Sequence, residues 1–309
     1  MAVSGEQVAA LDAAVRRGRK PWYVDATVRL VREKPLGAVG AAIVLLFVLV
    51  AVFAEPLATY PYERVHLADT LLPPGTPGLD GTPTYYFGTD NLGRDVYSRI
   101  VYGARVSMTV ALGAVGLGMF FAILLGTLSG YLRGTFDLII QRVVDAWISI
   151  PFFILLLTIM MIFKPGIGPV IFALALAGTF SNSRVVRSAV LTTMTMPYIE
   201  AARCTGAHNV RIILRHVLPN IIAPIIVVAT LGLGNVILAE SALSFLGLGV
   251  PPPYPTWGQM LSGSSRVFMY EAPWLAVVPG VAITLAVFGF NMFGDALRDL
   301  LDPRLRGSR

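Results

Sequence analysis

Charged side chains are scarce in this chain of 309 residues. Only 14% of the residues are Asp, Glu, Lys or Arg, whereas 55% are hydrophobic and the mean hydropathy is +0.71. A soluble protein contains about 25% charged residues and needs a polar surface, so this composition excludes an ordinary soluble domain. It also excludes intrinsic disorder, which requires low hydrophobicity and high net charge. The composition therefore predicts a protein whose solvent is largely lipid.

Residues that usually carry chemistry are also rare. The chain has a single cysteine, Cys204, which excludes a disulfide scaffold. It contains no Gly-Lys pair, and hence no phosphate-binding P-loop. The three histidines, His66, His208 and His216, are too scattered to predict a metal site. We expect no catalytic residue, no metal and no cofactor bound by this chain.

Long windows without charge indicate where the chain crosses a membrane. About 20 apolar residues are needed to cross the hydrocarbon core as a helix. A further charge-free window, 241–265, contains four prolines, so we assign its first part to the end of the fifth helix and the rest to a loop. The predicted fold class is thus an all-α polytopic membrane protein. Its six expected transmembrane helices are 35–54, 106–132, 146–163, 165–183, 216–239 and 272–294.

The distribution of basic residues predicts the orientation of the chain. Most of the 24 Lys and Arg residues fall on the side that holds the N-terminal tail, which makes that side cytoplasmic. The net charge of +6 is then a topology signal and predicts no nucleic-acid partner. The first apolar segment is longer than an export signal, so we expect an uncleaved helix. The expected organisation is a cytoplasmic tail 1–34, transmembrane helix 35–54, an extracytoplasmic segment 55–104, a core 105–296 with a cytoplasmic loop 187–217, and a cytoplasmic tail 297–309.

The cytoplasmic loop predicts two short helices. Pro197 suits a first helical turn, and Glu200 complements the positive end of the helix dipole. Gly206 suits a helix end in the left-handed conformation, which predicts a helix over 197–205. A second helix is expected over 209–217, with Pro219 at the turn into the next span. Such a loop either lies on the lipid surface or forms a rigid lever that docks on a cytoplasmic partner.

The same loop carries a resemblance to a known family. Glu200-Ala201-Ala202, then Gly206, then Leu218-Pro219 resembles the EAA loop of the permease subunits of binding-protein-dependent ABC importers. One position departs from the pattern, since His216 stands where an isoleucine is usual. Further runs resemble the dipeptide, oligopeptide and nickel importer subfamily, and within it the second (C-type) permease subunit. These runs are 87–95, 98–99, 102–105, 239–249, 294–299 and 302–306.

The resemblance implies a type I importer permease (MetI-like) fold and a transport function. A subunit of this kind moves peptides, delivered by an extracytoplasmic binding protein, across the plasma membrane of a bacterium or archaeon. The implied partners are a homologous permease subunit, two ABC ATPase subunits that bind ATP and Mg, and the binding protein. The implied contact with the ATPase consists of Glu200, Ala201, Ala202, Gly206, Leu218 and Pro219.

Two further features bear on the membrane part of the chain. Glu240 is the one acidic residue deep within an expected span, which makes it a candidate for a gate or the translocation pathway. Packing or gating, contact with substrate, and proton relay all remain open for it. Gly126 and Gly130 have the spacing at which two helices approach closely, so we expect them to be packing residues.

Other functions remain open on the sequence alone. A secondary transporter driven by an ion gradient is an alternative, although such folds tend to show inverted repeats, and none is evident here. An ABC permease for nickel or another small solute shares the same motifs. A membrane-anchored structural protein is disfavoured by the number of spans and by the long cytoplasmic loop.

Overall fold

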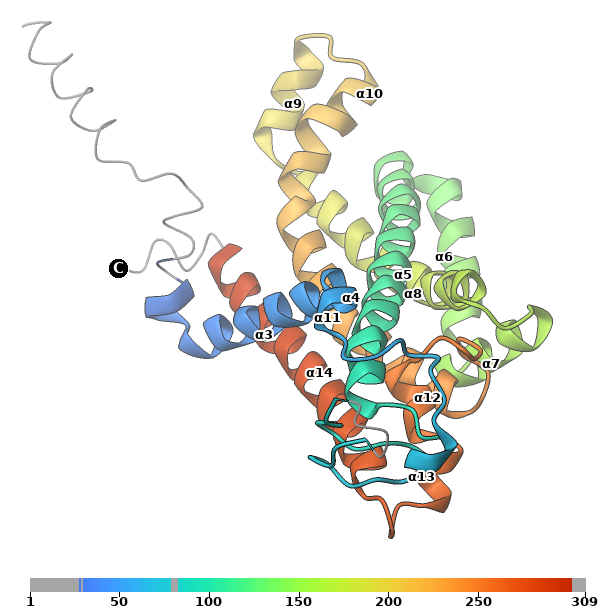
Figure 1. The fold of residues 1–309 in the computed structure, drawn as a ribbon. Coiled ribbons are helices and arrows are strands. Elements are labelled where there is room, and N and C mark those ends of the chain that lie inside the picture. The colour runs from blue at the N-terminus through green and yellow to red at the C-terminus, as the bar shows by residue number, and fades with distance from the viewer. Residues whose placement is uncertain (1–27, 29, 79–82, 302–309) are drawn as a thin grey trace, which may run out of the picture.

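The chain is built almost entirely from helices. The computed structural model describes residues 28, 30–78 and 83–301, so most of the N-terminal tail and the run 302–306 lie outside the described residues. Within the described part, strand-like pairing is limited to two isolated bridges, Thr76 with Tyr85 and Thr89 with Asp95. The predicted all-α fold is confirmed (Figure 1).

Five of the described helices are long and apolar enough to cross a membrane. One of these five, Asn209–Phe245, is continuous through α10 (Asn209–Ile212), the π-helical η2 (Ile213–Val217) and α11 (Leu218–Phe245). A sixth span results if two sharply bent helices are counted together. The five are α3 (Pro35–Val52), α5 (Val96–Leu132), α8 (Ile167–Thr193), Asn209–Phe245 and α14 (Trp274–Leu301).

The expected third span is not one straight helix. In its place are α6 (Gly134–Ile148) and α7 (Phe152–Ile162), which meet at an angle of 90°. Pro151 precedes α7, and a proline disfavours helical geometry in the residue before it and cannot donate a backbone hydrogen bond. The apolar window 146–163 therefore contains a break that its hydropathy does not reveal.

Several boundaries differ from the expected ones, and the fifth and sixth helices continue past theirs, to Phe245 and Leu301, the latter within the expected tail 297–309. Helix α5 already begins at Val96, within the segment assigned to the outside of the membrane. Its 37 residues extend about 55 Å at ~1.5 Å per residue, longer than a hydrocarbon core of about 30 Å. Helix α8 continues to Thr193, so the loop expected from residue 187 begins after it.

The turn expected at Pro219 is wrong. Pro219 lies in the first turn of α11, and the chain runs through it as one helix from Asn209 to Phe245. The five residues before α11 form the π-helical turn η2, and such wider turns alter the local hydrogen-bond pattern of a helix. The proline is thus accommodated without a break, and the short loop helix joins the membrane helix directly.

The long helices pack through small residues. A Cβ on Gly126 of α5 would lie 2.5 Å from the carbonyl oxygen of Ser183 on α8, and one on Gly130 would lie 3.0 Å from Cβ of Val190. Close contact between α3 and α14 has the same basis, because a Cβ on Gly40 would lie 2.8 Å from the carbonyl oxygen of Gly289. The GxxxG expectation for α5 is confirmed.

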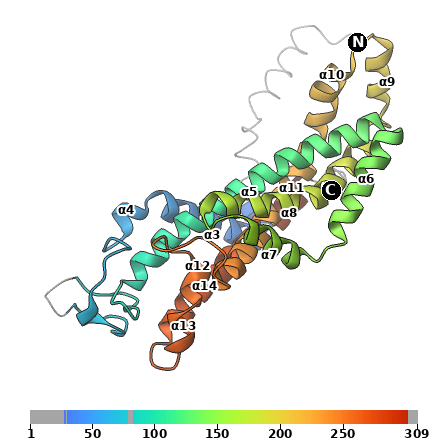
Figure 2. The ribbon, with the colours of Figure 1, turned by 90° about the vertical axis from the view of Figure 1, so that its right-hand side faces the viewer.

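The molecule has two distinct ends. Figure 2 shows α9 (Pro197–Cys204) and α10 at one end, with α13 (Ser264–Val267) and the loops before α5 at the other. The second end also contains α4 (Ala54–Leu57), the 3-10 helix η1 (Leu67–Asp69) and α12 (Trp257–Leu261). We refer to these as the α9 end and the α13 end.

Candidate coupling loop and translocation site

Helix α9 has an inner and an outer face. It begins with Pro197 in its first turn, as predicted, and extends over eight residues. Ile199 and Ala202 are buried beneath it, three residues apart on one helical face. Glu200 and Ala201 are exposed on the outer face. The apolar face anchors the helix, and the outer face is free for contact with another molecule.

Gly206 ends α9 as the sequence predicts. Its φ is +80°, in the left-handed region. The amide of Gly206 donates to the carbonyl oxygen of Arg203 at 2.9 Å, and the amide of Ala207 donates to that of Ala202 at 3.0 Å. This pair of hydrogen bonds is the Schellman arrangement, which satisfies carbonyl groups at a helix end. The chain therefore reverses from α9 to α10 with a defined geometry.

The loop rests on the membrane helices. Tyr131, near the end of α5, donates from its hydroxyl to Oδ1 of Asn209 at 2.7 Å. Ile199 and Ile212 belong to a buried cluster that includes Val190 of α8 and Ile221 of α11. Because α10 continues through η2 into α11, the loop is joined directly to a membrane helix.

The six residues expected at the ATPase contact do not share one surface. Glu200, Ala201, Gly206 and Pro219 are exposed. Ala202 is only 9% exposed, and Leu218 packs against the buried cluster beneath the loop. These two side chains support the loop from within, and only the exposed residues are available to a partner.

Glu240 lies fully buried near the far end of α11. Its carboxylate accepts a hydrogen bond from the hydroxyl of Ser244 at 2.7 Å and one from Ser107 of α5 at 3.3 Å. In this conformation the side chain joins α5 to α11 and faces no open space. Of the roles left open for it, this geometry favours packing or gating.

Helix α12 is wedged between α5 and α11 beside Glu240. Trp257 is fully buried, and its Nε1 donates to the carbonyl oxygen of Ile100 at 3.1 Å. A Cβ on Gly258 would lie only 2.3 Å from the carbonyl oxygen of Ser241. The proline-rich segment assigned to a loop thus folds back into the ends of the membrane helices, and it holds two short helices.

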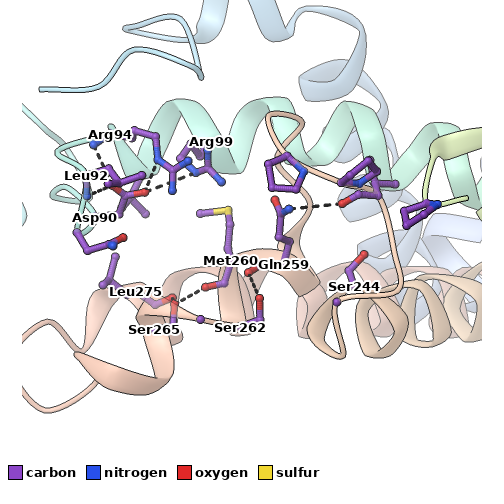
Figure 3. A pocket seen from close by; sticks show the side chains of 18 residues that line it. Asp90, Leu92, Arg94, Arg99, Ser244, Gln259, Met260, Ser262, Ser265 and Leu275 are labelled. Carbon is purple, nitrogen blue, oxygen red and sulfur yellow. Dashed lines mark hydrogen bonds and ion pairs between the residues drawn. The ribbon is translucent and has the colours of Figure 1, made fainter.

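A cavity of about 460 Å³ opens at the α13 end (Figure 3). Its walls come from the start of α5, the loops after α7 and α11, and helices α12 to α14. The charged side chains gather on one side, where Arg94 and Arg99 lie next to each other, with Met260 and Gln259 opposite them. We call this space the outer cavity, because the sequence predicts that this end of the chain faces away from the cytoplasm.

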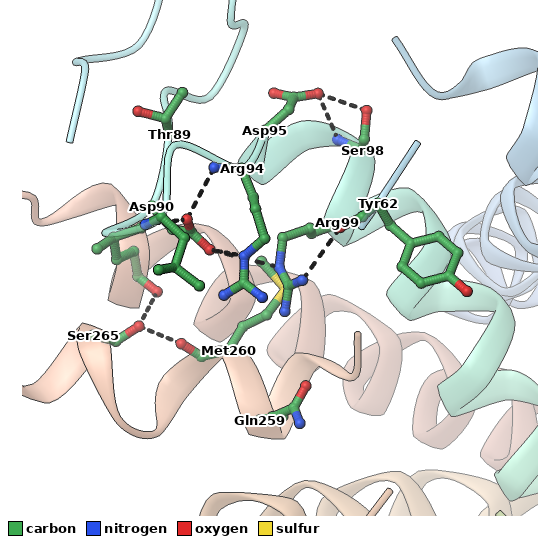
Figure 4. A network of polar contacts seen from close by, with 12 residues as sticks. Tyr62, Thr89, Asp90, Arg94, Asp95, Ser98, Arg99, Gln259, Met260 and Ser265 are labelled. Carbon is green, nitrogen blue, oxygen red and sulfur yellow. Dashed lines mark hydrogen bonds and ion pairs between the residues drawn. The ribbon is translucent and has the colours of Figure 1, made fainter. Parts of the chain in front are cut away.

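The charged side of the outer cavity is a small network (Figure 4). Asp90 is 7% exposed, and its Oδ2 accepts from Nε of Arg94 at 2.7 Å. Nε of Arg99 lies 3.9 Å from the same oxygen, and Nη1 of Arg99 lies 3.5 Å from the carbonyl oxygen of Tyr62. In the sequence, the run 87–95 carries only a resemblance to the importer subfamily. The signal that would have identified this site is the set of charged residues Asp90, Arg94 and Arg99 at the start of an apolar helix.

Asp95 fixes the beginning of α5. Its carboxylate accepts from the backbone amides of Tyr97 at 3.3 Å and Ser98 at 3.0 Å, and from the Ser98 hydroxyl at 2.6 Å. Burial raises the pKa of Asp95 above its ordinary value, although these hydrogen bonds act in the opposite direction. This N-cap sets the first turn of α5 and so the position of Arg99.

A family model for the inner membrane component of binding-protein-dependent transport systems matches residues 122–307. This match covers more than half of the chain. The chain belongs to this family. A second model, the N-terminal transmembrane domain of oligopeptide transport permease C, matches residues 21–74. As a member of this family, the chain is a membrane-embedded subunit of a transport system. Membership also implies ATPase and substrate-binding partners.

Several relatives are similar over most of their length. The dipeptide transport system permease protein DppC of Alkalihalophilus pseudofirmus is 41% identical, covering 93% of this chain and 91% of that protein. The oligopeptide transport system permease protein OppC of Bacillus subtilis is 35% identical, covering 92% of this chain and 90% of that protein. The expected family and C-type subfamily are confirmed.

A solved structure supports the fold. A chain of the MetNI methionine ABC transporter in an inward facing conformation superposes with a TM-score of 0.55. The two sequences are 18% identical, and the superposition covers 66% of this chain and 96% of the transporter chain. The expected MetI-like permease fold is confirmed by this likeness.

Proposed function

We propose that this chain is one permease subunit of an ATP-driven importer of peptides. It forms a heterodimer with a homologous permease, and substrate reaches it from an extracytoplasmic binding protein. The names of the relatives support peptides as the substrate class, because they include dipeptide, di/tripeptide and oligopeptide permeases. ATP and Mg bind to two partner ATPase subunits, and no residue of this chain takes part in hydrolysis.

The observation that carries this proposal is the loop formed by α9 and α10, residues 197–212, which we call the coupling loop. Helix α9 presents Glu200, Ala201 and Gly206 on an exposed surface and is fixed from below by a buried cluster. In the proposed mechanism an ATPase subunit grips this surface and moves it on binding and hydrolysing ATP. The continuous helix from Asn209 carries the motion to Glu240, about 45 Å away at ~1.5 Å per residue.

The proposal also sets the orientation of the chain. The α9 end faces the cytoplasm together with both terminal tails, 1–34 and 297–309. The segment 55–104 and the outer cavity face the opposite side of the plasma membrane, where the binding protein delivers its substrate. The concentration of basic residues on the α9 side supports this orientation.

Reconstitution tests the proposed function. The chain is co-purified with the proteins encoded beside its gene and placed in liposomes, and ATP hydrolysis is measured with and without binding protein and a dipeptide. We expect hydrolysis to rise when both are present, together with uptake of the labelled dipeptide. Uptake that persists without an ATPase subunit and follows a pH gradient contradicts the proposal and identifies a secondary transporter. Uptake of a nickel chelate in place of peptides contradicts the substrate class.

A further inference from the structure

The outer cavity contains an excess of positive charge. Asp90 already accepts at both oxygens, from the backbone amides of Leu92 at 2.9 Å and Arg94 at 3.0 Å and from Nε of Arg94 at 2.7 Å. Its charge is therefore committed to Arg94 and to its own loop. The charged residues that line the cavity are this one carboxylate and two arginines, among the residues the structure describes. One guanidinium charge remains unbalanced at the wall.

Arg99 carries that charge in a buried position. Its side chain is 6% exposed, and its contacts with Asp90 at 3.9 Å and Tyr62 at 3.5 Å are both longer than a good hydrogen bond. A guanidinium has five N–H donors, and a buried cation is costly unless it is paired. The side chain lies at the cavity wall beside Arg94 (Figures 3 and 4). Its geometry suits a ligand with two acceptor oxygens in one plane.

The remaining walls of the cavity suit a small amphipathic molecule. Met260 and Leu275 provide apolar surface, while Asn91 and Gln259 provide amide groups. The volume of about 460 Å³ falls within the range of about 300–1,000 Å³ that is usual for small-molecule sites. A short peptide has the matching chemistry, with a terminal carboxylate, polar amides and an apolar side chain.

We propose that the outer cavity binds the C-terminal carboxylate of a peptide on its way from the binding protein into the membrane. Arg99 receives the carboxylate in a bidentate pair, and Arg94 adds a second positive charge. The apolar wall at Met260 and Leu275 contacts the peptide side chain. This inference rests on the proposed function, because it takes peptides as the substrate.

Photolabelling of the reconstituted complex, without binding protein, tests the site directly. The probe is a dipeptide that carries a diazirine in its side chain, compared with the same dipeptide as its C-terminal amide. We expect the acid to label the chain segments around Met260 and Leu275, and the amide to label them about tenfold less, since hydrogen bonds to a charged group are lost. This comparison uses the natural chain, so it does not depend on the folding of a variant. Equal labelling by acid and amide overturns the proposal.

Three variants identify the residue that recognises the carboxylate. Arg99→Gln should label about tenfold less with the acid and be unchanged with the amide, and Arg99→Lys should recover part of the signal because the charge remains. Arg266→Gln is the matched control, an exposed arginine at the same end that contacts the ring of Phe245 and does not line the cavity. A signal that is unchanged in Arg99→Gln, or reduced equally in Arg266→Gln, overturns the role of Arg99.

Dipeptide uptake with binding protein, measured on the same complexes, separates the two proposals. If the natural complex imports dipeptide but labels equally with acid and amide, only the cavity assignment fails. If the natural complex imports no dipeptide, the proposed function fails, and the cavity assignment fails with it.

Discussion

Gly206 ends α9 with a backbone conformation that a branched side chain rarely adopts. Within the described residues no atom lies within 4 Å of the place a Cβ would take, so a substitution acts through the backbone alone. We expect Gly206→Val to strain the loop by about 1–3 kcal/mol and to lower the amount of peptide imported per ATP hydrolysed. Uptake and phosphate release, measured together in proteoliposomes, give this ratio.

Gly75 provides a matched control for Gly206. It has φ +83° in the segment before α5, is exposed, and likewise has no described atom near the Cβ position. Gly75→Val should leave the ratio of uptake to hydrolysis unchanged, because this glycine lies at the other end of the molecule. If Gly206→Val imports as much peptide per ATP as the natural chain, the loop geometry has no role in coupling.

Glu240 is expected to act through its hydrogen bonds and not through its charge. Gln at this position can accept from one of Ser107 and Ser244 and donate to the other, so Glu240→Gln should fold and import nearly as well as the natural chain. Glu240→Leu leaves two buried hydroxyls without this acceptor and should lower the free energy of unfolding by about 1–3 kcal/mol. Thermal unfolding of the purified protein and peptide uptake are the measurements.

The two Glu240 variants also separate the roles left open by the sequence. A Gln variant that unfolds like the natural chain but imports no peptide would show that the carboxylate charge itself is needed, for substrate contact or for proton transfer. That result would contradict a packing or gating role.

The sequence identified some site residues and missed others for physical reasons. Composition alone isolated Glu240, because an acid is rare within an apolar span. The loop pattern predicts Ala202 at the ATPase contact but does not give the direction of its side chain, since only the packing of α9 shows that it faces inward. Arg99 was missed because its burial depends on a tertiary contact. Two separate loop segments, which contain Tyr62 and Asp90, fold against the start of α5.

At the scale of whole elements, the contact between α5 and α8 depends on Gly126. We expect Gly126→Ala to destabilise the protein, because the added Cβ would lie 2.5 Å from the Ser183 carbonyl oxygen and the backbones would have to separate. Gly116→Ala, on an exposed part of the same helix with no described atom within 4 Å, should be neutral or stabilising by up to about 1 kcal/mol. Thermal unfolding in detergent distinguishes them. Equal stability of the two variants would show that the close approach is not needed.

The helices themselves were predicted with different success. Five spans were recognisable because an apolar window of sufficient length has no alternative to a helix in lipid. The break between α6 and α7 was missed, although Pro151 marks it, because the flanking residues are apolar on both sides. At Pro219 a turn was expected, but the helix is continuous there, since the π-helical η2 allows it to continue through a proline.

For the molecule as a whole, the orientation in the membrane can be read from one cysteine. Cys204 is the only cysteine in the sequence, and it is exposed at the end of α9. We expect a membrane-impermeant maleimide to label it in inside-out vesicles and not in intact cells. In a Cys204→Ser background, Gly75→Cys at the opposite end should show the reverse pattern.

The same cysteine links orientation to assembly. Cys204 lies two positions before Gly206, beside the exposed surface that we assign to the ATPase contact. Co-expressed ATPase subunits should therefore slow its labelling in inside-out vesicles while leaving that of Gly75→Cys in intact cells unchanged. Labelling of Cys204 from outside intact cells would place α9 where no cytoplasmic ATPase could reach it. The coupling loop and the direction of import both depend on this one placement, so that result would contradict them together.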